Sequence, residues 1–218
     1  MNLLWITDPW TTLDHARDTT LRLIEEARRY GAKSWICDTA ALRLDDGDVR
    51  ARCRLVESVP KDRGEQGWGF GRTEDLAVSH FDLVHYRVDP PVDRRYWEPL
   101  QLLRLAEAAG TPTRIVNPPS VLVLVSEKLG PAPLVGYLPP TVVASAWEDL
   151  EAFGVGQQRT VLKPLGDAQS RAVRLLDWTT RDELERTRSL LEEATGGFRR
   201  PVVLQRFLDE VVAQGEKR

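Results

Sequence analysis

The chain has 218 residues, with 30 Lys+Arg against 33 Asp+Glu and a formal charge of −3. This length allows one large or two small domains, and the balanced charge argues against a protein that mainly binds nucleic-acid phosphates. No apolar run reaches the ~18 residues that a membrane-spanning helix requires. The two cysteines form no disulfide framework and no CxxC, which predicts a reducing, cytoplasmic location. The three histidines lack the spacing of a metal site.

Strand and helix patterns alternate over residues 1–129, which predicts an α/β fold with a mostly parallel sheet. The predicted strands are 3–7, 34–37, 82–87 and 113–116, with a hairpin formed by 42–47 and 49–59. The predicted helices are 14–30 and 96–109, followed by a short helix or apolar segment at 121–129. Residues 60–75 are rich in glycine and predict an irregular segment, and within it we expect GWGFG at 67–71 to be a flexible loop.

Residues 130–140 contain four prolines and two glycines, which favours a linker at this point. Beyond it the pattern predicts a small α+β unit. Its predicted strands are 141–144, 160–162, 171–176 and 201–207, and its predicted helices are 146–153 and 181–194. The last strand is strongly apolar and would normally lie inside a sheet with further chain to follow. We therefore expect this unit to be incomplete and its final strand to be uncovered.

Arginine outnumbers lysine 25 to 5, so each lysine in an apolar setting is of interest for its own chemistry. Lys163 ends an apolar strand and precedes a proline. It either meets an anion or extends out of an edge strand into water, and the sequence favours neither. Lys128 ends an apolar segment, where the pattern taken alone favours a cation at a helix C-terminus over a binding residue. Arg87 and Asp89 lie beside a Pro-Pro loop at a strand end, where either a ligand or a surface ion cluster is expected.

No P-loop and no GxSxG elbow is present, but eight short segments form a pattern in chain order. They are Asp8-Pro9, RVDPPVD at 87–93, IVNPP at 115–119, EKL at 127–129, LPPT at 138–141, LKPL at 162–165, QRFL at 205–208 and GEKR at 215–218. Each is weak alone, but together they span essentially the whole chain. In this order they resemble prokaryotic glutathione synthetase.

The resemblance implies a Rossmann-like pre-ATP-grasp domain at 1–129, the linker at 130–140, and a partial ATP-grasp domain, the α+β lid, at 141–218. It implies an ATP-dependent ligase that joins γ-glutamylcysteine to glycine through an acyl phosphate, with magnesium on the phosphates. The ATP contacts implied are Lys128, Lys163, Gln205, Phe207, Leu208 and Glu216. The substrate contacts implied are Arg87, Asp89 and Arg218.

Two departures from the family pattern lead to two hypotheses. Residues 166–171 read GDAQSR where the family has a glycine-rich phosphate loop, and the sequence stops where the family continues into its magnesium-binding half. The chain is therefore either part of a ligase whose remaining half lies elsewhere or a non-catalytic relative that acts as a binding module. We expect these residues alone to be inactive, to bind ATP weakly, and to self-associate or pair with a complementing chain through 141–218.

Overall fold

The computed structural model describes residues 1–62, 67–124, 126, 128–166 and 172–215. The chain divides into two compact units, Met1–Leu124 (unit 1) and Val125–Arg218 (unit 2). Residues 130–140, the expected linker, lie within unit 2 and include the 3-10 helix η4 (Ala132–Tyr137). No helix in the described part of the chain is long and apolar enough to cross a membrane.

Unit 1 is built on a seven-stranded mixed sheet with the strand order β3-β4-β2-β1-β6-β7, and β5 also pairs with β4. The strands are β1 (Asn2–Thr7), β2 (Lys33–Asp38), β3 (Leu42–Asp45), β4 (Asp48–Ser58), β5 (Gly69–Ala77), β6 (Leu83–Tyr86) and β7 (Arg114–Val116). The helices are α1 (Thr19–Arg29), α2 (Arg94–Ala108) and α3 (Pro119–Leu122), with 3-10 turns η1 (Trp10–Thr12), η2 (Thr39–Ala41) and η3 (Val78–His80). Strands β2, β1, β6 and β7 are parallel, which confirms the predicted α/β class.

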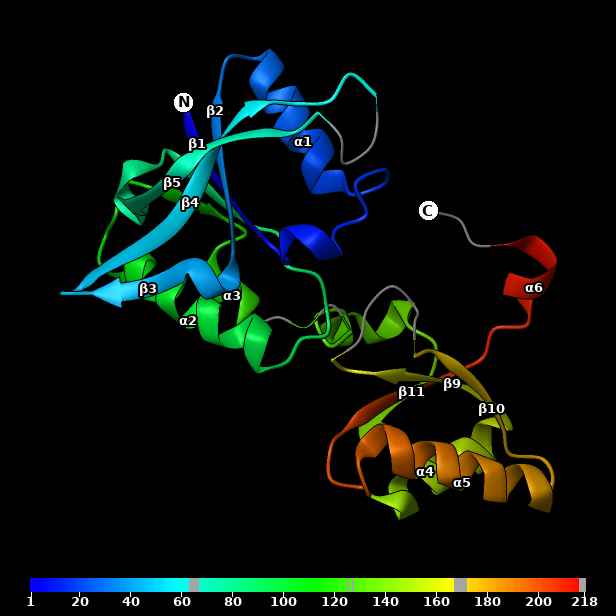
Figure 1. Cartoon of the computed structure of the whole chain (residues 1–218). Coiled ribbons are helices and arrows are strands. Elements are labelled where there is room, and N and C mark those ends of the chain that lie inside the picture. Colours follow the sequence, from blue (N-terminus) through cyan, green and yellow to red (C-terminus); the bar gives the residue numbers. More distant parts are fainter. Residues whose placement is uncertain (63–66, 125, 127, 167–171, 216–218) are drawn as a thin grey trace. The chain divides into compact units, whose positions relative to one another are not determined.

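Helices cover both faces of this sheet, as Figure 1 shows for α1 and α2. In β1, Leu3 and Trp5 pack into the cluster on the α1 side, whereas Leu4 and Ile6 pack into the cluster on the α2 side. Successive side chains of a strand point to opposite faces, so a strand buried on both faces must be apolar throughout. That requirement explains the unbroken apolar run at the start of the chain.

The prediction of an irregular loop at 60–75 is wrong over its second half, because β5 begins at Gly69 and pairs antiparallel with β4. A Cβ at Gly69 would lie 2.4 Å from the Ser58 hydroxyl oxygen, and one at Gly71 would lie 2.9 Å from Glu57 Oε1. These glycines leave room for the Ser58 and Glu57 side chains of the neighbouring strand. Glycine content was misread as flexibility.

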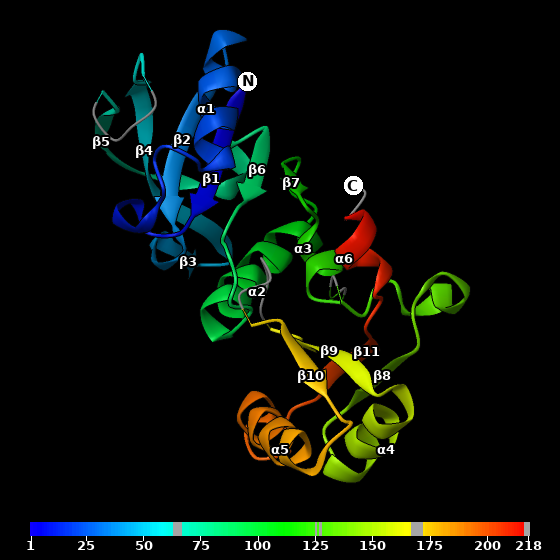
Figure 2. The same ribbon diagram turned by 90° about the vertical axis from the view of Figure 1, so that its right-hand side faces the viewer.

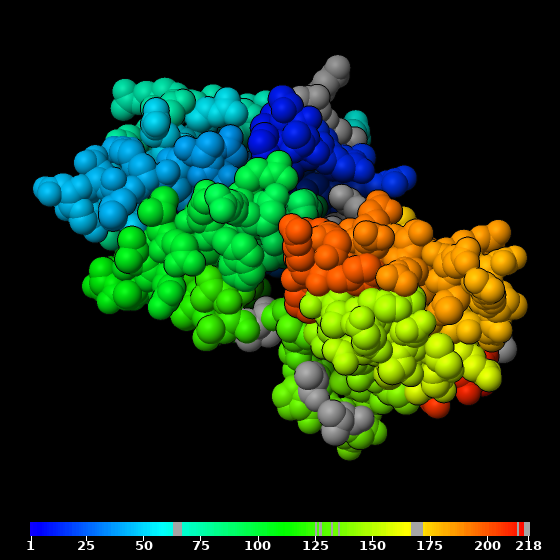
Figure 3. All heavy atoms as spheres, turned by 90° about the horizontal axis from the view of Figure 1, so that it is seen from below, coloured from blue at the N-terminus to red at the C-terminus, as the bar shows by residue number. Residues whose placement is uncertain are grey.

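Unit 2 is a four-stranded antiparallel sheet with the order β10-β9-β11-β8. Its strands are β8 (Thr141–Ala144), β9 (Arg159–Pro164), β10 (Arg174–Asp177) and β11 (Val202–Arg206). Its helices are α4 (Trp147–Gln157), α5 (Arg181–Thr195) and α6 (Glu210–Gln214). Helices α4 and α5 lie on one face of the sheet, as Figure 2 shows. Figure 3 views this helical side, where α4 (yellow-green) and α5 (orange) form one continuous outer surface.

The expectation that the last strand is uncovered is wrong. Strand β11 lies between β9 and β8, and Val202, Val203 and Leu204 are 1%, 2% and 0% exposed. An apolar, β-branched strand occupies an interior position of the sheet, and the edges are β8 and β10. The argument for self-association that rested on this strand is therefore lost.

Candidate functional site

Successive side chains along the strands of unit 2 point alternately to the two faces of the sheet. One face packs against helices, and the other face carries polar groups. Leu162 and Leu204 point into the core beneath α4 and α5. On the other face, Val203 of β11 pairs with Lys163 of β9 and with Val143 of β8. Two pairs further along, and therefore on the same face, Gln205 of β11 lies opposite Thr141 of β8. The register thus brings two polar side chains and one cation together on a single face of the sheet.

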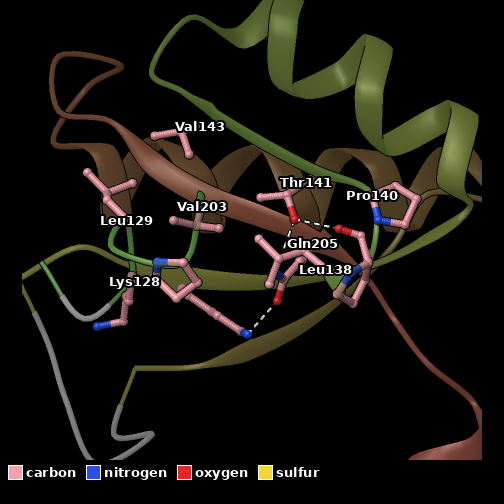
Figure 4. Close-up of a pocket in the computed structure, with 11 residues that line it drawn as sticks. Lys128, Leu129, Leu138, Pro140, Thr141, Val143, Val203 and Gln205 are labelled. Atoms are coloured by element: carbon pink, nitrogen blue, oxygen red, sulfur yellow. Dashed lines mark hydrogen bonds between the residues drawn. The ribbon is translucent and has the colours of Figure 1, made fainter. Parts of the chain in front are cut away.

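These side chains line a pocket of about 590 Å³. Its lining residues come from this face and from the segment before β8: Lys128, Leu129, Pro131, Leu138, Pro139, Pro140, Thr141, Val143, Lys163, Val203 and Gln205. Figure 4 shows Lys128 and Gln205 on the walls of the same pocket. The volume falls within the ~300–1,000 Å³ of typical small-molecule sites.

A chain of hydrogen bonds holds the polar groups of the pocket in place. Lys163 Nζ donates to Gln205 Oε1 at 2.6 Å, and Gln205 Nε2 donates to Thr141 Oγ1 at 3.0 Å. Thr141 Oγ1 in turn donates to the Pro139 carbonyl at 2.7 Å. Because an ammonium group can only donate, the Gln205 amide must turn its oxygen toward Lys163. Figure 4 shows this relay as dashed lines.

The electrostatics of the pocket favour an anion. Burial lowers the pKa of Lys163, and the charge of Lys128 lowers it further. None of the described residues that line the pocket carries a carboxylate. A negatively charged ligand beside Lys163 would offset both its burial and the repulsion from Lys128.

The other predicted ATP contacts do not line this pocket. The Phe207 amide donates to the Arg159 carbonyl at 3.0 Å, and its ring lies 4.5 Å from the Arg159 guanidinium carbon. The Leu208 carbonyl accepts from the Val211 amide at 3.2 Å. The predicted contacts Glu216 and Arg218 lie outside the described residues, so these assignments stay predictions.

The predicted substrate contacts Arg87 and Asp89 lie at the end of β6 in unit 1. The Arg87 guanidinium donates to Thr20 Oγ1 at 3.2 Å and to Thr19 Oγ1 at 3.1 Å, at the start of α1. The Asp89 amide donates to Asp8 Oδ2 at 2.8 Å. These contacts join the ends of neighbouring elements, and the assignment of Arg87 and Asp89 to a substrate stays a prediction.

Thr141 also lines the pocket, and no role for it was predicted from the sequence. The available signal was its place in the LPPT segment at the start of a strand, two positions before Val143 on the same face. Over the part of the chain that the structure describes, no group of three or more His, Cys, Asp or Glu side chains is arranged to hold a metal ion. No residue is therefore assigned to magnesium.

Comparison with known families gives two matches in chain order. The model of the prokaryotic glutathione synthetase N-terminal domain matches residues 1–122, and the model of the ATP-grasp domain of the same family matches residues 127–218. The chain belongs to the prokaryotic glutathione synthetase family.

Relatives support this membership along the whole chain. The glutathione synthetase of Parasynechococcus marenigrum is 34% identical over 219 residues, and that of Prochlorococcus marinus is 33% identical over 220 residues. Both alignments cover 100% of this chain and 67% of the relative. The chain thus spans about two thirds of the length of these glutathione synthetases.

Solved structures show the fold. The chain resembles D-cycloserine synthetase DcsG with a TM-score of 0.54 and 18% identity, covering 98% of this chain and 62% of that one. It resembles D-alanyl-alanine synthetase A from Vibrio cholerae with a TM-score of 0.56 and 10% identity, covering 95% and 60%. The RimK domain ATP-grasp protein from Sphaerobacter thermophilus gives a TM-score of 0.55 at 17% identity, covering 95% and 64%. The glutathione synthetase-like chain therefore has an ATP-grasp arrangement of its elements.

Proposed function

We propose that the chain binds the phosphates of ATP in the pocket of unit 2 and serves an ATP-dependent ligase that joins γ-glutamylcysteine to glycine. One observation carries the proposal: Lys163 and Lys128 share a pocket whose described lining holds no carboxylate. Family membership supports ATP as the anion, because the ATP-grasp model matches the part of the chain that contains both lysines.

The side chains act in this proposal by holding charge. Phosphoryl transfer depends mainly on positioning and on cations near the oxygen atoms that gain charge. The relay from Gln205 to Thr141 fixes the position of the Lys163 ammonium before a ligand enters. Bound ATP supplies the phosphoryl group that activates a carboxylate, and the two lysines hold its oxygens.

The remaining contacts belong to the same proposal. Phe207, Leu208 and Glu216 are proposed to contact the base and the ribose. Arg87, Asp89 and Arg218 are proposed to contact the γ-glutamyl substrate, a set drawn from sequence pattern alone. Magnesium is proposed to accompany the phosphates, as the family resemblance implies.

Calorimetric titration of the chain with ATP in the presence of magnesium tests the role of the lysines. We expect Lys163→Met and Lys128→Met each to weaken ATP binding about tenfold or more, equivalent to about 1.4 kcal/mol. The matched control is Lys33→Met, since Lys33 is an exposed lysine at the start of β2 in unit 1. An unchanged dissociation constant in Lys163→Met would refute phosphate binding by this pocket.

A second candidate function is a non-catalytic binding module, which the sequence of residues 166–171 favours. The family's glycine-rich phosphate loop is replaced there, and backbone amides wrap a phosphate most readily in glycine-rich segments. The triple variant Asp167→Gly, Gln169→Gly, Ser170→Gly separates the candidates. ATP binding that tightens tenfold or more supports the module, whereas unchanged binding supports the ligase.

We further propose a cytoplasmic location. Cys37 and Cys53 are both free and buried, which supports a reducing compartment. Labelling of the thiols after denaturation of the protein isolated from its source tests this: two reactive thiols support the proposal, and a mixed or internal disulfide contradicts it.

A further inference from the structure

The face of the unit 2 sheet that carries the lysine pocket continues beyond Gln205 for one more pair of residues. Lys163 and Arg159 are four positions apart on β9 and therefore point to the same face. Gln205 and Phe207 are two positions apart, along β11 and the segment that follows it. The Phe207 amide donates to the Arg159 carbonyl at 3.0 Å, which extends the pairing of β9 with β11 by one residue. Arg159 thus lies on the polar face, on the far side of Gln205 from Lys163.

Arg159 differs from Lys163 because two carboxylates lie near it. Its guanidinium forms an ion pair with Asp209 at 2.5 Å, and Asp177 of β10 lies directly opposite it in the sheet. Hydrogen bonds from Thr179 lower the pKa of Asp177, and the charge of Arg159 lowers it further. A cation that already faces carboxylates gains less from a phosphate than Lys163 does, since the described lining of the lysine pocket holds none. Arg159 is therefore poorly suited to bind the phosphates of a nucleotide.

Arg159 instead contacts the segment between β11 and α6 at three points. Its carbonyl accepts from the Phe207 amide, and its guanidinium carbon lies 4.5 Å from the centre of the Phe207 ring. Its ion pair reaches Asp209, the residue directly before α6. An aspartate at this position often caps its helix, but the Asp209 side chain caps no amide in the described part of α6. The carboxylate joins this segment to β9 instead.

We propose that Arg159 is a positioning residue for the base of the nucleotide: it fixes the course of residues 207–209 before the nucleotide binds and makes no contact with the nucleotide itself. The inference rests on the proposed function, in which Phe207 and Leu208 contact the base. Leu208 lies between the two residues whose side chains Arg159 contacts. A binding segment that is ordered in advance loses less conformational entropy when the ligand arrives.

The test compares two ligands by calorimetry in the presence of magnesium: ATP, and inorganic tripolyphosphate, which has the phosphates but no base. Arg159→Gln removes the charge from a side chain that is 41% exposed, so we expect the chain to remain folded. This variant should weaken ATP binding about three- to tenfold and leave tripolyphosphate binding within about twofold. Lys163→Met should weaken the binding of both ligands, because it acts on the phosphates that they share.

The stacking of Arg159 on Phe207 gives a second measurement that a general loss of structure would not produce. Phe207→Leu removes the ring and keeps an apolar side chain. In this background Arg159→Gln should weaken ATP binding less than it does in the unchanged chain, because both substitutions act through the same segment. The matched control is Arg181→Gln, which removes the same charge from a 91% exposed side chain of α5 and should leave the binding of both ligands unchanged.

Three results would overturn the positioning role of Arg159. They are unchanged ATP binding in Arg159→Gln, equal weakening of ATP and tripolyphosphate, and an undiminished effect of Arg159→Gln in the Phe207→Leu background. Failure of the proposed function looks different, because Lys163→Met would then leave ATP binding unchanged. A chain that binds neither ligand would contradict both the phosphate site and the positioning role.

Discussion

The two units form their pockets in different ways. In unit 1 the pocket lies at the ends of parallel strands, whereas in unit 2 it lies on the face of an antiparallel sheet. Helices cover both faces of the parallel sheet, so its faces are filled by core side chains such as Leu4 and Trp5. Asp8 and Asp38 of the pocket accordingly lie at the ends of the parallel strands.

The antiparallel sheet of unit 2 carries its two long helices on one face. The other face can therefore hold Lys163 and Gln205 without burying them in the apolar core. The position of a functional side chain is thus determined by which surfaces the packing leaves open. In the parallel part of unit 1, Asp8 directly follows a strand and Asp38 ends one, whereas in unit 2 the pocket side chains lie within strands at every second position.

The largest predicted effect tests whether the two faces of unit 2 differ as described. Leu204→Ala removes a fully buried side chain from the helix-covered face, and we expect a loss of about 2–5 kcal/mol in the free energy of unfolding. Val143→Ala alters a side chain that is 42% exposed on the pocket face, and it should cost less than about 1 kcal/mol. Urea unfolding followed by hydrogen exchange of unit 2 amides measures both.

The control for this pair is Leu4→Ala in β1, which should destabilise unit 1 and leave exchange in unit 2 unchanged. Equal costs for Leu204→Ala and Val143→Ala would show that the pocket face is as tightly packed as the helical face. The structural contrast between the two faces would then be incorrect.

A second prediction compares two glycines of α4. A Cβ at Gly154 would lie 2.1 Å from the Trp178 ring, so Gly154→Ala must displace that ring. We expect a loss of about 1–3 kcal/mol from this overpacking. Gly156 has nothing within 4 Å of a Cβ, and Gly156→Ala should stabilise the helix by about 0.5–1 kcal/mol. Thermal unfolding monitored by Trp fluorescence shows whether each substitution raises or lowers the stability. A stabilising Gly154→Ala would contradict the close packing of α4 on Trp178.

A third prediction concerns pH and unit 1. Burial, with a smaller contribution from Arg87, lowers the pKa of His85 from 6.5 to about 4. The folded state therefore favours neutral His85, and the unfolded state takes up the proton first as the pH falls. The stability is fully present above pH 6.5 and is lost as the pH falls from about 6.5 toward 4, by on the order of 1–2 kcal/mol at pH 5.

His85→Phe isolates this effect, because a phenyl ring can keep the stacking on Trp5, where the ring centres are 4.1 Å apart. The measured quantity is the difference in unfolding free energy between pH 7 and pH 5, taken from exchange of β1 amides. We expect the wild-type chain to lose more stability than His85→Phe over this interval. Parallel losses would show that His85 does not titrate in the way its burial implies.

The order of strands and helices could be predicted from the sequence because periodicity reports burial directly. The alternating strands and helices of unit 1 and the strand positions of unit 2 followed from apolar patterns. Strand β5 could not be predicted in this way, since Gly69 and Gly71 have no side chains to show a period. The burial of β11 was also missed, because a strand's neighbours in a sheet are set by pairing with distant segments.

The candidate site was predictable only in part, for a similar reason. The sequence singled out Lys163 but could not decide between an anion site and a solvated edge. Its environment depends on Gln205, 42 positions away, and on Lys128. The pocket at the carboxyl ends of β1 and β2 gave no signal, because its lining residues Asp8, Arg52 and Arg54 come from segments that are far apart in the sequence.

The smallest predicted effect compares the first turns of α1 and α5. The Asp18 carboxylate accepts from two amides, those of Thr20 at 2.7 Å and Leu21 at 3.1 Å, whereas Thr180 Oγ1 accepts from the Glu183 amide at 3.3 Å. Asp18→Ala should therefore cost about 1–2 kcal/mol and Thr180→Ala about 0.5–1 kcal/mol. Exchange of the first-turn amides reports each cap within its own unit.

Because the Asp18 charge also acts on Asp8, Asp18→Ala should lower the pKa of Asp8 as well, which carboxyl NMR can follow. A cap that is lost without any change at Asp8 would separate helix capping from the charge of the unit 1 pocket.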